Sequence, residues 1–133
     1  MAKFIVITWN IEGICRGFPS LALFCDLHSP DLIFLSEPQV FNCDMSLFAP
    51  QLAHYKFYLN GEDRFDPDIP SDSLHAKGGT LALWKAPLDP YVTVLPSTSP
   101  AVLPLLLSIP GLSKSIHIGI YLPTRHLLFS NFI

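Results

Sequence analysis

Three apolar runs in this chain each end on a polar side chain, and this pattern limits the folds that the sequence can adopt. The runs are short, rich in β-branched and aromatic residues, and closed by turn-forming residues; they cover 4–10, 31–37 and 116–121. Such runs are typical of strands that are buried on both faces of a sheet. Because ligands of open α/β sheets gather at the carboxyl ends of strands, Asn10, Glu37 and Tyr121 are candidates for one shared site.

The remaining pattern predicts an α/β fold. A helix is expected from an N-cap at Ser20 to residue 28, and it joins the first two strands as a crossover connection. A shorter helix is expected over 44–53, with Asp44 as its cap. The polar residues 60–77 predict a long surface loop. Further strands are predicted over 55–59, 80–84, 91–95 and within 101–112.

The composition and charge of the chain limit the kinds of partner that it can bind. Half of the residues are hydrophobic and only 14% are charged, against about a quarter in an average protein. This excess fits strands buried on both faces, and it also fits a fragment that needs a second half to cover it. The net charge is −3, and the eight Lys and Arg residues form no cluster. Since DNA-binding domains usually carry a basic stripe, we expect weak or no autonomous binding of nucleic acid.

The cysteines and the apolar segments indicate where in the cell the protein is located. Cys15, Cys25 and Cys43 are odd in number and lack a C-x-x-C spacing, so they predict free thiols inside the cell, in the cytoplasm or nucleus. No secretory signal peptide is recognisable. The apolar run 101–112 contains two prolines and falls short of the roughly 20 residues that span a membrane. No membrane association is expected.

Four sequence motifs, in this order, carry a family resemblance. They are 9–13 (WNIEG), 30–37 (PDLIFLSE), 78–85 (GGTLALWK) and 121–124 (YLPT). Together they resemble the endonuclease/exonuclease/phosphatase superfamily, and most closely the apurinic-like endonuclease domain of non-LTR retrotransposons. The resemblance implies a DNase I-like sandwich of two sheets with helices outside. It covers the N-terminal half of that domain, so residues 1–133 are interpreted as a truncated, partial domain.

The resemblance also implies a chemistry, which is Mg²⁺-dependent hydrolysis of a phosphodiester with DNA as the family's partner. Glu37 would hold the metal, because Mg²⁺ prefers carboxylate oxygens. Glu12 would lie near a second metal position. Asn10 and Tyr121 would be catalytic, since an amide and a phenol can donate hydrogen bonds to a phosphate. From the residues alone, a solvated glutamate, a turn asparagine and a core aromatic explain the same positions.

Two motifs of the family are missing from the sequence, an Asp-x-Asn and a terminal Ser-Asp-His. No aspartate follows Asp89. We therefore expect an endonuclease fragment that is inactive alone and binds Mg²⁺ weakly or not at all. Two alternatives stay open: a non-enzymatic interaction module that binds a partner through an exposed apolar sheet, and a relative that cleaves lipid or inositol phosphodiesters. Because half a sandwich would leave the inner face of its sheet uncovered, we also expect the isolated chain to self-associate through that sheet.

Overall fold

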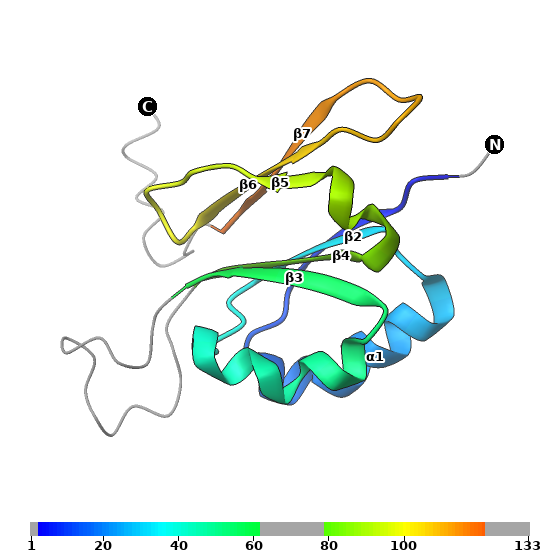
Figure 1. Ribbon diagram of the computed structural model, residues 1–133. Helices are drawn as coiled ribbons and strands as arrows, with labels where there is room; N and C mark the ends of the chain where they lie inside the picture. The colour runs from blue at the N-terminus through cyan, green and yellow to red at the C-terminus, as the bar shows by residue number, and fades with distance from the viewer. Residues whose placement is uncertain (1–2, 62–78, 122–133) are drawn as a thin grey trace, which may run out of the picture.

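Two β-sheets stacked face to face form the centre of the molecule, as the computed structural model in Figure 1 shows for residues 3–61 and 79–121. In spatial order, the first sheet contains β1 (Val6–Asn10), β2 (Leu32–Ser36), β4 (Thr80–Lys85) and β3 (Tyr55–Asn60). The second contains β5 (Val92–Val94), β6 (Val102–Leu107) and β7 (Ser115–Ile120). Among the described strands, only the pair β1–β2 is parallel, as the predicted crossover requires.

Three of the four described helices cover one face of the molecule. The described helices are α1 (Ile14–His28) and the 3₁₀ helices η1 (Asn42–Leu47), η2 (Ala49–Leu52) and η3 (Ala86–Tyr91). In Figure 1, α1, η1 and η2 lie below the four-stranded sheet, and no described helix lies above the three-stranded sheet. The molecule is thus a partial α/β sandwich, in agreement with the fold class predicted from the sequence.

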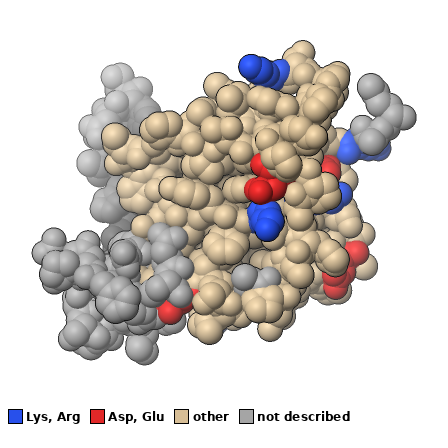
Figure 2. All heavy atoms as spheres, viewed as in Figure 1, with Lys and Arg blue, Asp and Glu red and all other residues tan. Residues whose placement is uncertain are grey.

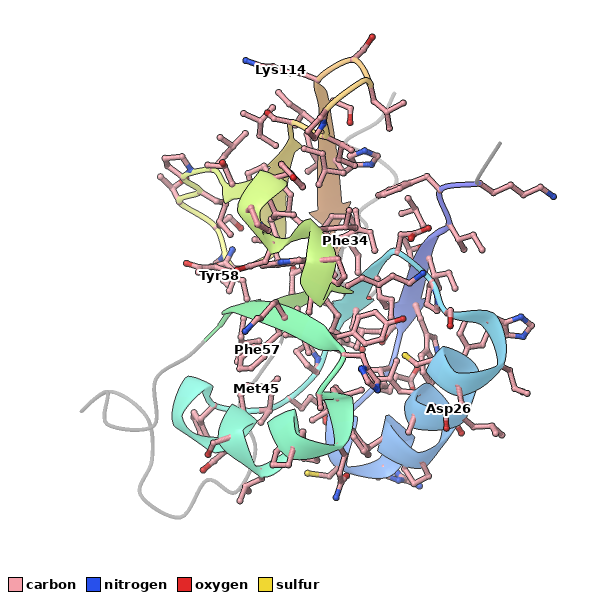
Figure 3. All side chains as sticks on the ribbon, turned by 45° about the vertical axis from the view of Figure 1, so that its right-hand side comes forward. Asp26, Phe34, Met45, Phe57, Tyr58 and Lys114 are labelled. Carbon is pink, nitrogen blue, oxygen red and sulfur yellow. The ribbon has the colours of Figure 1, made fainter. Side chains whose placement is uncertain are left out.

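The core has two layers. Below the four-stranded sheet, Ile14, Leu21 and Met45 pack against the buried underside of β2 and β4. Between the sheets, Phe34 packs against Leu105 and its neighbours on β6. Figure 3 shows Met45 and Phe34 on these opposite sides of the sheet. The inner faces of the two sheets therefore cover each other, and the expectation that half a sandwich leaves an inner face open is wrong.

The burial of the strands differs from the prediction. β2 and β4 are buried on both faces, but β1 and β7 are largely exposed. The reason is their place in the sheets: β1 and β7 are edge strands, each paired on one side only within the described residues. An uninterrupted apolar run therefore does not guarantee two covered faces.

The first helix begins earlier than predicted. Gly13, with φ at 101°, is the N-cap, and Pro19 lies inside the helix. The buried stripe Ile14, Phe18, Leu21 and Cys25 has helical spacing from the start, so packing outweighs the local cost of the proline.

Two further expectations need correction. The single helix over 44–53 is two short 3₁₀ helices, whose N-caps are Phe41 and Phe48 rather than Asp44. Pro50 at the start of the second helix is compatible with a new helical turn but not with a continuous helix. Of the predicted loop 60–77, Asn60 instead ends β3, and 62–77 lies outside the described residues.

Asn60 links the two sheets. Its Nδ2 donates to the carbonyls of Ser99 and Val102, both at 2.9 Å. We predict that Asn60→Ala lowers the free energy of unfolding by about 1–2 kcal/mol, because two partly buried carbonyls lose a donor. Chemical denaturation measures this free energy. The control is Thr93→Ala, at an exposed position of β5, which should change the free energy of unfolding by less than about 0.5 kcal/mol. Equal stability of the two variants would contradict the assigned link.

Candidate functional site

The carboxyl ends of three strands meet at one end of the sandwich. Asn10 ends β1 and is the register partner of Ser36, the last residue of β2. Glu37 follows directly. Tyr121 follows β7 in the other sheet, and its phenol donates a hydrogen bond to Oε1 of Glu37. The structure therefore joins two of the candidate residues across the sheets, although 84 positions separate them in the sequence.

Glu37 has an unusual backbone conformation. Its φ of 53° lies in the left-handed region, which costs a residue with a side chain about 1–3 kcal/mol. Neighbouring segments hold it there: Glu37 N donates to the Gly79 carbonyl at 3.2 Å, and the Glu37 carbonyl accepts from Gly13 N at 2.8 Å. The next carbonyl, of Pro38, accepts from Ile14 N at 2.8 Å. Backbone outliers clamped in this way cluster at functional sites.

The turn after β1 places the other two candidates. Oδ1 of Asn10 accepts a hydrogen bond from Glu12 N at 3.2 Å, an Asx-type turn. Glu12 takes a left-handed φ of 50°, and both side chains are exposed. The Nδ2 group of Asn10 can donate to a ligand, while the bonded Oδ1 fixes the plane of the amide.

Glu12 and Glu37 share a cavity of about 440 Å³. It is completed by the first turn of α1 and by the segment after β2, through Gly13, Cys15, Arg16 and Gln39. The cavity therefore combines two carboxylates with one guanidinium group. Such a mixture suits a cation together with the phosphate that the cation would neutralise.

The donor chemistry fits Mg²⁺ better than a transition metal. The side chains at the site offer carboxylate, amide and phenol oxygens beside a single thiol, that of Cys15, and Oε2 of Glu37 is not engaged by Tyr121. Within 3–61 and 79–121, no three His, Cys, Asp or Glu side chains come close enough to form a metal site. The residues thus fit a hydrated ion held by one or two carboxylates, the usual coordination of Mg²⁺.

Arg16 and Gln39 line the same cavity, although the sequence analysis did not single them out. The predicted helix begins only after Ser20, whereas Arg16 lies in the first turn of α1. Gln39, with φ at 52°, follows Pro38 in a segment without periodicity. An apolar stripe starting at Ile14 was the one signal that could have located Arg16.

A second polar cluster lies at the opposite end of the four-stranded sheet. Tyr55 donates to the Pro30 carbonyl at 2.7 Å and lines, with Cys25, a cavity of about 540 Å³. Desolvation by burial raises the pKa of the Cys25 thiol and of the Tyr55 phenol. Both groups therefore stay protonated near neutral pH, which argues for a packing role and against a nucleophilic one.

Comparisons with solved structures agree on the fold. The AP endonuclease LMAP from Leishmania major matches 97% of this chain with a TM-score of 0.67 and 18% identity. The 3′ phosphatase NExo from Neisseria, bound to a product DNA hairpin, matches 86% with a TM-score of 0.56 and 15% identity. TDP2 from D. rerio, complexed with a single-strand DNA product, matches 89% with a TM-score of 0.54 and 16% identity.

The matched region is a part of each of these proteins. The chain spans 43% of LMAP, 40% of NExo and 45% of TDP2. No model of a protein family and no curated protein sequence matches the chain. The fold is therefore part of a DNase I-like sandwich of two sheets. Within the described residues, no helix is long and apolar enough to cross a membrane.

Proposed function

We propose that this chain supplies the metal-holding part of a Mg²⁺-dependent phosphodiesterase site that acts on DNA. The observation that carries the proposal is the hydrogen bond from Tyr121 to Glu37, beside the turn that holds Asn10 and Glu12. The three solved relatives support DNA as the substrate class, since they are an AP endonuclease and two proteins bound to DNA products. Within this group, the four motifs favour an endonuclease of the retrotransposon type. The odd number of cysteines favours a reducing compartment, the cytoplasm or nucleus.

Each residue has a role in this proposal. Glu37 holds the ion through Oε2, while Tyr121 fixes the orientation of its carboxylate. Asn10 donates its Nδ2 to a non-bridging phosphate oxygen, and Glu12 provides a second carboxylate at the rim. The bound Mg²⁺ would act as a Lewis acid on the phosphate. The protein's own contribution is a fixed geometry, because the strand ends and the clamped Glu37 backbone hold these groups in place before substrate arrives.

The charge distribution sets the strength of DNA binding. On the face shown in Figure 2, Lys and Arg side chains are scattered, some beside acidic side chains, and form no stripe. Non-specific affinity for DNA comes from neutralising phosphates with such side chains. We therefore propose that the chain alone binds DNA weakly and that recognition is limited to the phosphate at the site.

Metal binding tests the site directly. We predict that Mg²⁺, or Mn²⁺ as a paramagnetic probe, binds in the millimolar range, about 4 kcal/mol of binding free energy. Glu37→Gln should weaken binding at least about tenfold, ~1.4 kcal/mol, because it removes the charge and keeps the shape. Titration calorimetry and water-proton relaxation measure both values.

The matched control is Asp26→Asn. Asp26 is an exposed carboxylate on α1, away from the strand ends, as Figure 3 shows. The Asp26→Asn variant should bind Mg²⁺ and Mn²⁺ with the same affinity as the parent chain. Equal affinity of the parent, Glu37→Gln and Asp26→Asn chains would mean that the ion binds only to diffuse surface charge, and it would refute the proposed site.

A further inference from the structure

One cation in the cavity of the candidate metal site has no partner among the described residues. Arg16, in the first turn of α1, lines this cavity of about 440 Å³ together with Glu12 and Glu37. The Arg16 side chain is exposed, and it forms no ion pair or hydrogen bond with another described residue. Its guanidinium group is therefore available to an anion that enters the cavity.

The local backbone explains why Arg16 does not pair with its nearest carboxylate in the sequence. Glu12 precedes it by four positions, the spacing at which opposite charges pair on a helix. However, α1 begins only at Ile14, and Glu12 has a left-handed φ of 50°. Glu12 thus lies outside the helical register that would bring the two charges together. The two side chains share a cavity without neutralising each other.

The charges of the cavity match a phosphodiester when a metal ion is held there. Its two carboxylates and single guanidinium group carry one net negative charge, which one Mg²⁺ changes to one net positive charge. A phosphodiester carries a single negative charge, so it brings the loaded cavity to neutrality. If Arg16 were neutral, the loaded cavity would have no net charge with which to attract the diester.

The shape of the guanidinium group also suits a phosphate. Its N–H donors form a planar fork that matches the oxygens of a phosphate. In the proposed function, the phosphate receives the metal ion and the Nδ2 group of Asn10, which ends β1. Arg16 adds donors from a different element, α1, for the second non-bridging oxygen. Donors from two elements would fix both the position and the orientation of the phosphate.

We propose that Arg16 is the phosphate-binding residue of this site and that it selects a singly charged phosphodiester. The inference rests on the proposed function, because Arg16 acts beside an ion that Glu37 holds. It predicts opposite effects on two ligands, since a positive charge opposes the binding of a cation and favours the binding of an anion. A residue that only supported the fold would affect both ligands in the same direction.

Mn²⁺ and dimethyl phosphate test this on the whole chain. Water-proton relaxation gives the affinity for Mn²⁺ alone, and the ³¹P relaxation of dimethyl phosphate reports the diester bound beside the ion. Arg16→Gln should bind Mn²⁺ as tightly as the parent chain or up to about threefold more tightly. The same variant should hold at least about fivefold less diester per bound ion. Arg16→Lys keeps the charge but loses the fork, so it should hold an intermediate amount.

Lys114→Gln is the matched control, because it removes one positive charge far from the cavity. Lys114 is exposed and precedes β7, whereas Tyr121 follows the other end of that strand. Figure 3 shows Lys114 at the tip of the β6–β7 hairpin, away from α1. The control should change neither measurement by more than about twofold. Circular dichroism verifies that each variant is folded, and Arg16→Lys decides the matter if Arg16→Gln is not.

The outcomes separate this inference from the proposed function. If Glu37→Gln weakens Mn²⁺ binding but Arg16→Gln holds as much diester as the parent chain, the metal site stands and the role of Arg16 is refuted. If Glu37→Gln binds Mn²⁺ like the parent chain, the proposed function fails and the inference fails with it. A parallel loss of Mn²⁺ and diester in Arg16→Gln, or an equal loss of diester in Lys114→Gln, also overturns the inference.

Discussion

Purified chain should not nick supercoiled plasmid DNA in the presence of Mg²⁺. The residues at the strand ends can hold an ion and a phosphate, but the proposed roles of Asn10, Glu12, Glu37 and Tyr121 include neither the activation of water nor the protonation of the leaving oxygen. General acid and base catalysis each contribute about 10²–10⁴-fold to a rate. Without both, and with a metal bound only in the millimolar range, nicking should stay below detection in an agarose-gel assay.

The comparison that matters is with Glu37→Ala. We expect the parent chain and this variant to be equally inactive on plasmids with and without abasic sites. Asp26→Asn serves again as the surface control. If nicking by the parent chain persists through purification, disappears in Glu37→Ala and survives in Asp26→Asn, then the site is catalytically more complete than we infer.

The strands and their polar ends could be predicted because both signals are local. Apolar runs closed by turn residues located β1, β2 and β7 to within two residues of their observed bounds. Burial could not be predicted in the same way, since it depends on which strands lie at sheet edges. The run of β1 reads like that of β2, yet Val6 is 40% exposed and Leu32 is fully buried.

The site was accessible to sequence reasoning only in part. Asn10 and Glu37 could be placed together because parallel strands end at the same edge of a sheet. The hydrogen bond between Tyr121 and Glu37 depends on how two sheets stack, which no local pattern encodes. The left-handed backbone of Glu37 was equally hidden, because three hydrogen bonds from distant segments hold it there.

The stacking of the two sheets should be sensitive to a single methyl group at Gly119. This residue lies in β7 and faces the four-stranded sheet, so a Cβ there would lie 2.4 Å from Cδ1 of Phe34. The Phe34 ring is 4% exposed and packed among the leucines of β6, so it cannot move aside without disturbing the core. We expect Gly119→Ala to lower the free energy of unfolding by about 1–3 kcal/mol.

Gly61→Ala is the matched control for this prediction. Gly61 would add its methyl group at 3.5 Å from Leu59, an ordinary contact, so the same substitution should be neutral or stabilising by about 0.4–1 kcal/mol. Urea denaturation measures both variants, and it is carried out at one fixed protein concentration because association would make the apparent stability depend on that concentration. The larger loss at Gly119 follows only if β7 packs directly on Phe34. Equal stability of the two variants would therefore mean that the sheets are not stacked in this register, and the contact between Tyr121 and Glu37 would lose its structural basis.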